Sequence, residues 1–319
     1  MIRLPETRDL LKEIGEPIVK SAFADVANAE IPSATARSAL ISFSERWKDY
    51  SRAALMVMCC EAVGGDPAAV LPAAKALVLS GGAFDLHDDI VDGSFTRTDK
   101  CVQTTLGRYG SNVTMLAGDA LLIEGMSQLY LLSKQVSPEQ VSDIIRTIKN
   151  GLYELGSAEV DELELVRNIK VTPDMYLRIV RMKAADVESY TRVGAMVGRG
   201  SPQEIDALGT FGRMLGMAVI LRDDIEDTFN DKRELFSRIA KESLPLPLIY
   251  SLDDPCCIKK ITAIQATGDP AELDALLGII ENNGSFEKTK AYIQELLQQS
   301  KLALRHVKDP SKLLTLFNE

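Results

Sequence analysis

Phe84 to Asp92, read FDLHDDIVD, is the stretch that decides how the rest of the sequence is interpreted. A second stretch, Leu221 to Asp227, reads LRDDIED and repeats the same spacing of acidic residues. At about 100° per residue, a helix places the aspartates of each Asp-Asp-x-x-Asp pattern on one side, with aliphatic residues on another. The aspartates of the two motifs are Asp88, Asp89, Asp92, Asp223, Asp224 and Asp227.

Carboxylates clustered on a helix need a physical explanation. Like charges one turn apart destabilise a helix by roughly 0.2–0.5 kcal/mol per pair, so two such clusters indicate a ligand that compensates the cost. Hard carboxylate oxygens suit Mg²⁺. A solvated acidic face is the alternative for either motif alone, but two motifs set in strongly apolar helices favour metal binding. We therefore expect both clusters to bind Mg²⁺.

The composition favours a helical fold. Of 319 residues, 46% are hydrophobic and only 6% aromatic, with abundant Ala, Leu, Ile and Met. Two histidines leave little for a zinc site or a Ser-His-Asp triad, and a net charge of −10 argues against nucleic acid as the partner. The five cysteines have no metal-ligand spacing and are typical of a reducing, cytoplasmic compartment. We see no apolar run near 18 residues and no secretion signal, so no transmembrane segment is expected.

Helix start signals organise the whole chain, and strand patterns are nearly absent. Helices are expected over 4–26, 32–65, 66–92, 115–132, 137–160, 172–198 and from 201 through the second motif, with shorter ones beyond 247. Residues 93–110 are polar and are expected to form a long loop. No linker or low-complexity segment interrupts the pattern. The sequence therefore predicts one all-α domain over residues 1–319.

The two aspartate motifs, in a helical chain of this length, resemble those of the trans-prenyl diphosphate synthases of the polyprenyl synthetase family, such as farnesyl and geranylgeranyl diphosphate synthases. Three short strings add to the resemblance: EAVGGD at 61–66, GDALL at 118–122 and LPLIY at 246–250. The resemblance implies a single-domain helical bundle of the isoprenoid synthase type around a deep central cavity. The two aspartate-rich helices then face each other across its mouth.

The resemblance also implies the chemistry. In the family, three Mg²⁺ ions bridge the aspartates to an allylic diphosphate, and its C–O bond breaks to give an allylic cation. The double bond of isopentenyl diphosphate attacks this cation and a proton is lost, in a cavity from which water is excluded. The expected enzyme is a prenyltransferase of the geranyltranstransferase or farnesyltranstransferase type. Family members are generally homodimers.

Further site residues follow from the resemblance by position. Lys183 matches a lysine that contacts the allylic diphosphate, although Ala184 replaces the threonine beside it. Arg97 falls near the paired arginines that follow the first motif. Taken alone, both cations are more typical of a protein surface. Phe84, one turn before Asp88, is a bulky residue where the growing chain would descend, and it predicts a C10 to C20 product; ordinary core packing is the alternative.

The sequence departs from the family in the region that binds isopentenyl diphosphate. Where the family has a glycine-lysine-arginine string, residues 47–53 read WKDYSRA, so that Lys48 and Arg52 are imperfect candidates. Ile220 replaces a glutamine, and residues 230–242 replace a lysine-bearing loop. The allylic metal site is therefore expected to be intact, and the site for isopentenyl diphosphate to be weakened.

Two functions follow from this asymmetry, and two others remain as alternatives. The chain is a working short-chain synthase, or it is a subunit of a hetero-oligomeric synthase that depends on a homologous partner for activity or product control. A terpene cyclase is less favoured, because cyclases commonly carry an Asn/Ser/Glu motif in place of the second aspartate cluster. A non-catalytic, Mg²⁺-dependent binding protein would leave an intact metal constellation unused.

Overall fold

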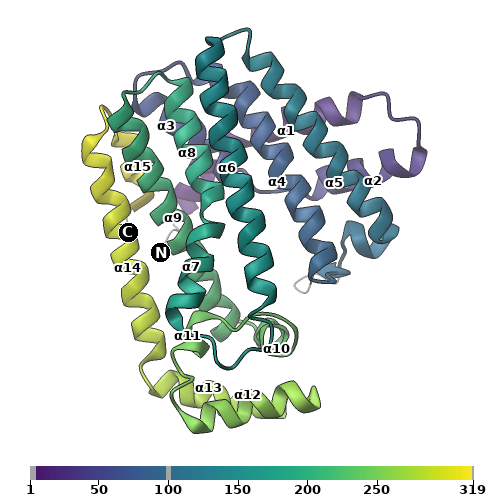
Figure 1. Ribbon diagram of the computed structural model, residues 1–319, viewed down its shortest axis with the longest axis vertical. Coiled ribbons are helices and arrows are strands. Elements are labelled where there is room, and N and C mark those ends of the chain that lie inside the picture. The colour runs from purple at the N-terminus through teal and green to yellow at the C-terminus, as the bar shows by residue number, and fades with distance from the viewer. Residues whose placement is uncertain (1–4, 98–101, 318–319) are drawn as a thin grey trace. The chain divides into compact units, whose positions relative to one another are not determined.

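The computed structural model describes residues 5–97 and 102–317, and nearly all of its regular structure is helical (Figure 1). This confirms the prediction of an all-α fold. The chain divides into two compact units: residues 1–149, 189–209 and 304–319 form unit 1, and residues 150–188 and 210–303 form unit 2. The first aspartate motif lies in unit 1 and the second in unit 2. That residues 1–319 form a single domain stays a prediction.

Unit 1 contains the N-terminal helices and a small hairpin. Its elements are α1 (Pro5–Asn28), α2 (Ala34–Arg46), α3 (Ser51–Ala62), η1 (Pro67–Val70), α4 (Leu71–Val91), the antiparallel strands β1 (Thr96–Arg97) and β2 (Val102–Gln103), α5 (Thr105–Leu132) and α15 (Ser311–Leu314). The division between the units falls inside α6 (Pro138–Leu163), α8 (Ala185–Val197) and α9 (Pro202–Phe229).

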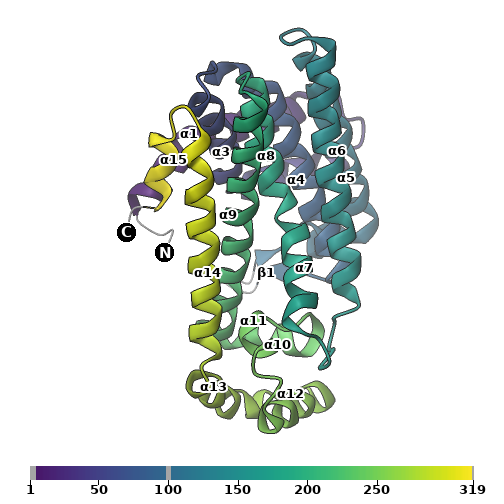
Figure 2. The ribbon, with the colours of Figure 1, turned by 60° about the vertical axis from the view of Figure 1, so that its left-hand side comes forward.

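Unit 2 contains α7 and most of the C-terminal helices. Its elements are α7 (Pro173–Lys183), α10 (Lys232–Lys241), α11 (Leu246–Ile249), α12 (Pro255–Thr267), η2 (Pro270–Glu272), α13 (Leu273–Asn282) and α14 (Ser285–Ala303). Figure 2 shows α12 and α13 beside α10 and α11, with α14 leading away from α13. Arg213 of α9 ties this unit together: its guanidinium donates to Glu154 in a bidentate pair (2.6 and 2.9 Å) and also to Glu188.

Local capping explains where several helices begin. The hydroxyl of Thr172 accepts from Met175 N (3.3 Å) at the start of α7. Ser201 and Glu204 form a reciprocal capping box at the start of α9, with Ser201 N donating to Glu204 Oε2 (2.8 Å). These side chains satisfy backbone donors that have no partner within the helix. The predicted starts at these two positions are therefore confirmed.

Three expected boundaries were wrong. The helix expected over 32–65 is two helices, because the chain leaves helical geometry between α2 and α3. The helix expected over 172–198 ends at Lys183 and a new one begins at Ala185. The loop expected over 93–110 holds the β1–β2 hairpin and the first turn of α5, whose start is capped by Thr104; Gly110 (φ 77°, ψ 168°) then kinks this helix.

Glycines allow α4, which carries the first motif, to pack closely against α5 (Figure 1). A Cβ built on Gly118 of α5 would lie 2.4 Å from His87 Nε2, and one on Gly125 would lie 2.9 Å from the Ala76 carbonyl oxygen. A Cβ on Gly82 would lie 3.0 Å from the Phe43 ring. The close approach of the Phe43 ring thus explains why a glycine occupies position 82. Helix α4 continues without a break through Gly81.

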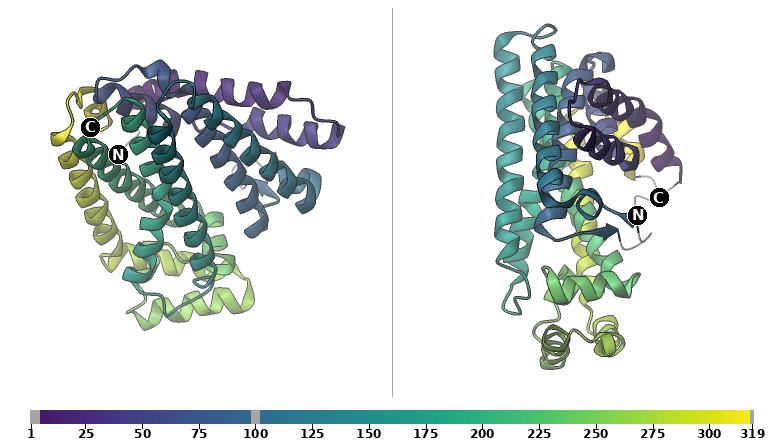
Figure 3. Two further views of the ribbon diagram at one scale, coloured as in Figure 1. Left: turned by 45° about the horizontal axis from the view of Figure 1, so that its top comes forward. Right: turned by 90° about the vertical axis from the view of Figure 1, so that its right-hand side faces the viewer.

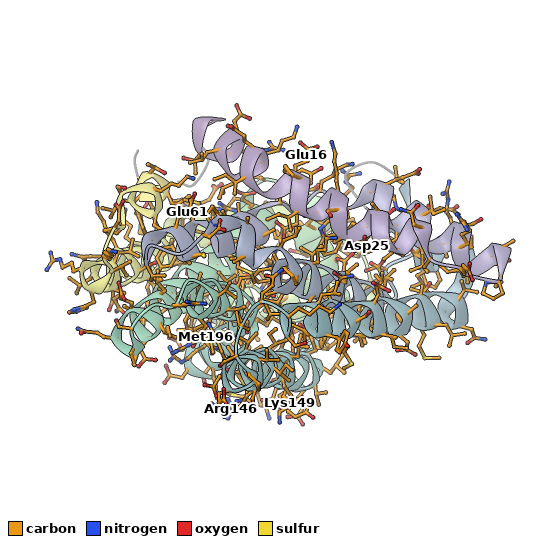
Figure 4. All side chains as sticks on the ribbon, turned by 90° about the horizontal axis from the view of Figure 1, so that it is seen from above. Glu16, Asp25, Glu61, Arg146, Lys149 and Met196 are labelled. Atoms are coloured by element: carbon orange, nitrogen blue, oxygen red, sulfur yellow. The ribbon has the colours of Figure 1, made fainter. Side chains whose placement is uncertain are left out.

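Helix α1 contacts both helices of this pair through the carboxylate of Asp25. Asp25, labelled in Figure 4, accepts from Lys75 Nζ of α4 (2.8 Å) and from Gln128 Nε2 of α5 (3.0 Å). Helix α2 runs beside α1, as the left view of Figure 3 shows. The helix of the first motif is therefore held by a polar junction as well as by close packing.

One described segment, Pro67–Val91, has the length and hydropathy of a helix that could cross a membrane. Of its apolar window, 67% is buried inside the protein. The core helix of a folded domain has the same properties, so the feature is weak evidence for a membrane span.

Candidate functional site

The first aspartate motif lies at the C-terminal end of α4. Asp89 is buried, Asp88 is partly buried and Asp92 is exposed at the helix end, where its backbone N–H donates to the Asp88 carbonyl oxygen (2.9 Å). The chain then turns, and Ser94 N donates to the Asp89 carbonyl oxygen (2.8 Å). Thr104 Oγ1 donates to the Ser94 carbonyl oxygen (2.6 Å), which fixes the turn against the start of α5. These hydrogen bonds therefore hold the helix end that carries the three aspartates.

Two other predicted residues lie near this motif in the sequence. Phe84 is partly buried on α4, one turn before Asp88. Arg97 ends β1, and its side chain lies outside the described residues. Their roles in substrate binding stay predictions.

The candidate cations for isopentenyl diphosphate lie near the start of α3: Lys48 precedes the helix, and Arg52 is in its first turn and already has an anionic partner. Arg52 forms an ion pair with Asp49, whose Oδ1 also accepts from Ser51 N (3.0 Å) and the Ser51 hydroxyl (2.6 Å). Burial alone would raise the pKa of Asp49, but the Arg52 guanidinium and the Ser51 donors hold it below its usual value. Lys48 is exposed. The positive charge expected here is thus partly cancelled by the neighbouring Asp49.

The second motif, at the C-terminal end of α9, has three aspartates in different environments. The side chain of Asp224 is 2% exposed, that of Asp227 31% and that of Asp223 55%. Asp224 accepts from the Tyr176 hydroxyl (2.8 Å to Oδ1, 2.9 Å to Oδ2) and from Leu246 N (3.0 Å to Oδ2). Leu246 stands between two prolines and so supplies the backbone donor that its neighbours lack.

Two arginines contact this cluster: Arg222 lies 3.1 Å from Asp223 Oδ1, and Arg238 of α10 contacts the other two aspartates. The Nη2 of Arg238 lies 3.1 Å from Asp224 Oδ1 and its Nη1 lies 3.1 Å from Asp227 Oδ2, while Nε donates to the Ser243 carbonyl oxygen (3.0 Å). Burial raises the pKa of Asp224, and it raises that of Asp227 to about 6, although Arg238 opposes both shifts. Burial by itself lowers the pKa of Arg238, but the acidic groups around it keep the guanidinium charged.

Lys183 lies in the same unit as the second motif and is held by carboxylates of α6. Its Nζ lies 3.3 Å from Glu159 Oε1 and also pairs with Glu162. Glu162 accepts from the Ser243 hydroxyl (2.7 Å). Ser243 also accepts from Arg238 through its carbonyl oxygen, so it links the Lys183–Glu162 pair to Arg238. Burial would raise the pKa of Glu162, but Lys183 and Ser243 hold it below its usual value.

Within unit 2 the structure thus brings together the second motif, Arg238, Tyr176 and the carboxylate pair that holds Lys183. No three His, Cys, Asp or Glu side chains of the described residues converge closely enough to hold a metal by themselves. The motifs lie in different units, so their meeting across a cavity stays a prediction.

The comparisons with known proteins agree with these features. The sequence profile described as polyprenyl synthetase matches residues 48–280, which include both aspartate motifs. The chain belongs to the polyprenyl synthetase family. It is therefore a prenyltransferase of isoprenoid biosynthesis, as predicted.

The relatives of this polyprenyl synthetase differ in product. A short chain isoprenyl diphosphate synthase of Methanothermobacter thermautotrophicus is 26% identical over 257 residues, 78% of each chain. The octaprenyl diphosphate synthase of Escherichia coli is 27% identical over 81% of this chain and 80% of its own. A geranylgeranyl pyrophosphate synthetase from Pyrococcus horikoshii has a similar fold, with a TM-score of 0.86 over 98% of this chain and 96% of its own, at 23% identity.

Several residues that form hydrogen bonds or ion pairs with the predicted site residues of this polyprenyl synthetase could not be identified from the sequence. Tyr176 and Glu162 lie far from the second motif along the chain, and nothing in their neighbourhood marks them. Asp49 is different: an acid three residues before a basic residue at the start of a helix is a recognisable pairing signal. That spacing could have predicted its ion pair with Arg52.

Proposed function

We propose that this polyprenyl synthetase is a Mg²⁺-dependent trans-prenyl diphosphate synthase that condenses isopentenyl diphosphate with an allylic diphosphate to a C10–C20 product. The observation that carries the proposal is the pair of aspartate motifs, each at the end of a long helix, in a chain of this family. Membership of the family supports the reaction class. The length of the prenyl product is the proposed part, because some relatives are named as synthases of longer products.

The carboxylates fit Mg²⁺ by their chemistry. Asp88, Asp89 and Asp92 on α4 and the aspartates of α9 supply hard oxygen donors, and neither cluster contains a thiol that would favour a softer metal. Three bound Mg²⁺ ions would supply the positive charge that stabilises a departing diphosphate. This is the number that the family resemblance implies.

The residues of the chain bind and orient the two substrates. In the proposed reaction, Lys183 holds the allylic diphosphate, and Lys48, Arg52 and Arg97 hold isopentenyl diphosphate. The allylic C–O bond breaks, the isopentenyl double bond forms the new C–C bond, and a proton leaves the resulting cation for the released diphosphate. Apolar side chains exclude water from the cation.

Phe84 sets the proposed limit on product length. It lies on α4 one helical turn before Asp88, next to the fully buried Ala83. A bulky ring at this place limits the depth available to the growing chain. Phe84→Ala is expected to lengthen the products, measured by chromatography of the dephosphorylated alcohols. An unchanged distribution would remove Phe84 from this role.

An exposed apolar face on α5 supports a homodimer. Leu116, Ile123, Met126 and Tyr130 are each 62–70% exposed and share one side of the helix by their spacing. Contiguous apolar surface of this kind is typical of an interface, and we propose that a second copy of the chain covers it. Ile123→Glu is expected to yield monomers in analytical ultracentrifugation, whereas Leu302→Glu, an exposed apolar position on α14, leaves the dimer intact. A dimeric Ile123→Glu protein would exclude α5 as the interface.

A hetero-oligomeric synthase is the second candidate. The Asp49–Arg52 pair favours it, because it weakens the isopentenyl diphosphate site of this chain. A homologous partner would then cover the α5 face and supply activity. The cytoplasm is the proposed location for either form.

One incubation separates the candidates. The purified chain is mixed with Mg²⁺, isopentenyl diphosphate and dimethylallyl or geranyl diphosphate. Linear C15 or C20 diphosphate supports the synthase, and Asp88→Asn is expected to lower turnover by orders of magnitude because it removes an anionic metal ligand. Activity that appears only after a homologous protein is added supports the hetero-oligomer. Undiminished turnover of Asp88→Asn would contradict the metal assignment.

A further inference from the structure

Ser243 of unit 2 stands where the chain leaves α10 and passes the end of α6. Only 2% of the residue is exposed. Its hydroxyl donates to Glu162 Oε1 of α6 (2.7 Å), and the carbonyl oxygen of the preceding Glu242 accepts from Arg167 N (3.1 Å), just beyond the end of α6. Two hydrogen bonds therefore hold the segment 242–243 against this end of α6.

The carboxylate of Glu162 is engaged on both of its oxygens. Oε1 accepts from the Ser243 hydroxyl, and Oε2 pairs with Lys183 Nζ. Glu159 Oε1, one turn earlier on α6, lies 3.3 Å from the same ammonium. The side chains of Lys183 and Glu162 are 25% and 21% exposed, so solvent screens these charges incompletely. Two carboxylates thus direct Lys183, and the Ser243 hydroxyl fixes one of them.

The carbonyl oxygen of Ser243 makes a second connection. It accepts from Arg238 Nε (3.0 Å), and the two terminal nitrogens of that guanidinium each lie 3.1 Å from a carboxylate of the second aspartate motif. The hydroxyl and the carbonyl oxygen of one buried residue therefore contact the ion pairs of Lys183 and of the second motif. Because only the hydroxyl belongs to the side chain, a substitution can remove the first connection and keep the second.

We propose that Ser243 is a positioning residue for Lys183: its hydroxyl orients the Glu162 carboxylate, and this carboxylate sets how tightly the lysine is held before the allylic diphosphate binds. The inference rests on the proposed function, in which Lys183 holds that diphosphate. It extends the site to a residue of the connection between α10 and α11 that acts through another side chain.

The sharing of the Glu162 carboxylate gives the physical reason. A hydroxyl that donates to a carboxylate takes up part of its negative charge, and such a hydrogen bond is stronger than one between neutral groups. Without the Ser243 hydroxyl, the carboxylate is free to turn towards Lys183, so a diphosphate has to compete with a stronger ion pair. The loss of this hydroxyl is therefore expected to weaken the binding of the diphosphate.

The first experiment compares Ser243→Ala with Ser251→Ala. Ser251 is also in unit 2 and 2% exposed, but its hydroxyl donates to the Pro247 carbonyl oxygen (2.8 Å) and contacts Ser285 Oγ (2.7 Å) in place of a carboxylate. Calorimetry with Mg²⁺ and inorganic pyrophosphate measures the dissociation constant, and steady-state kinetics measure KM for geranyl diphosphate. Ser243→Ala is expected to raise both by about five- to tenfold while turnover changes little. Ser251→Ala should leave both unchanged, and equal values in the two variants would overturn the proposal.

The second experiment tests whether Ser243 acts through Glu162. In a Glu162→Ala background, Ser243→Ala should change the dissociation constant of Mg²⁺-pyrophosphate by less than about twofold, because the carboxylate through which the hydroxyl acts is gone. The same loss of affinity in both backgrounds would show that Ser243 acts on the ligand by another route, and the proposal would be wrong. Thermal unfolding checks that each variant is folded. Should the double variant not fold, the comparison of Ser243→Ala with Ser251→Ala decides by itself.

Chemical labelling of Lys183 separates failure of this inference from failure of the proposed function. An ammonium reacts with trinitrobenzenesulfonate only after it loses a proton, and a stronger ion pair opposes that loss. Peptide mass spectrometry without any ligand is expected to show that Lys183 reacts about threefold more slowly in Ser243→Ala, and at the wild-type rate in Ser251→Ala. An unchanged rate in Ser243→Ala overturns the positioning role, whatever the wild-type protein binds. Wild-type protein that binds no Mg²⁺-pyrophosphate and forms no prenyl product refutes the proposed function instead.

Discussion

Asp49→Asn is expected to strengthen the binding of isopentenyl diphosphate. Asp49 forms an ion pair with Arg52 of α3, one of the two predicted cations near the start of this helix. The carboxylate opposes a diphosphate in two ways, since it repels the phosphate charges and holds the guanidinium that would bind them. Asparagine keeps an oxygen that accepts from Ser51 N–H and the Ser51 hydroxyl, so the loop retains its local hydrogen bonds.

Coulomb's law sets the size of this effect. A carboxylate roughly 7 Å from a phosphate charge, at an effective dielectric constant of about 40, repels it by about 1 kcal/mol. Two phosphate charges double the repulsion and salt halves it again, so that roughly 1 kcal/mol remains and the Michaelis constant falls about fivefold. The Asp49 and Arg52 side chains are 28% and 42% exposed, and losing such a pair destabilises the fold by only about 0.2–1 kcal/mol.

Steady-state kinetics at saturating Mg²⁺ and allylic diphosphate measure the change. The Michaelis constant for isopentenyl diphosphate should fall in Asp49→Asn and rise in Arg52→Gln, while turnover changes little. Glu45→Gln, at an exposed position of α2, removes the same charge away from Arg52 and serves as the control. A wild-type Michaelis constant in Asp49→Asn, or an equal fall in Glu45→Gln, would refute the reasoning.

Three further changes test other parts of the structure. Arg213→Met removes the guanidinium that pairs with Glu154 and Glu188, and urea unfolding should show a loss of about 2–4 kcal/mol in the free energy of unfolding. A loss no larger than that of Arg233→Met, at an exposed arginine, would contradict this role. Glu162 has a pKa below its ordinary value of 4.5, so its contribution to stability is present above that pH and disappears as the pH falls. Thermal unfolding should therefore depend less on acid in Glu162→Gln, and an identical profile would contradict the lysine pairing. Gly118→Ala places a Cβ 2.4 Å from His87 Nε2 and should destabilise the protein by about 1–3 kcal/mol, whereas wild-type stability would show that the imidazole moves aside without cost.

The helix starts could be predicted from sequence because their causes are local. A threonine or serine before a proline or acidic residue supplies the capping acceptor, and Thr172 and Ser201 do this within three residues of themselves. The break between α2 and α3 has a distant cause. A Cβ on Gly15 of α1 would lie 2.0 Å from the Tyr50 carbonyl oxygen, so the chain crosses α1 there at backbone distance. A contact between residues 35 positions apart leaves no periodic signal in either segment.

In the candidate site, too, the local features could be predicted from the sequence and the features that depend on distant residues could not. The aspartate motifs could be found because their spacing matches the helical period, and the family profile confirms their setting. The three aspartates of the second motif are equivalent in the sequence but not in the structure. Which of them is buried depends on Tyr176, Arg238 and Leu246, which come from three different helices.

One arrangement recurs among the cations that the resemblance assigned to phosphate groups. Arg52 is paired with Asp49, and Lys183 with Glu159 and Glu162. A cation held by carboxylates keeps its position before substrate arrives, but it offers a diphosphate less net attraction than a solvated one. In the proposed function, the positive charge that such a ligand needs comes largely with the ligand, as its own complex with Mg²⁺. The acidic balance of the chain, at −10, therefore agrees with a site that recognises a magnesium diphosphate and discriminates against the free anion.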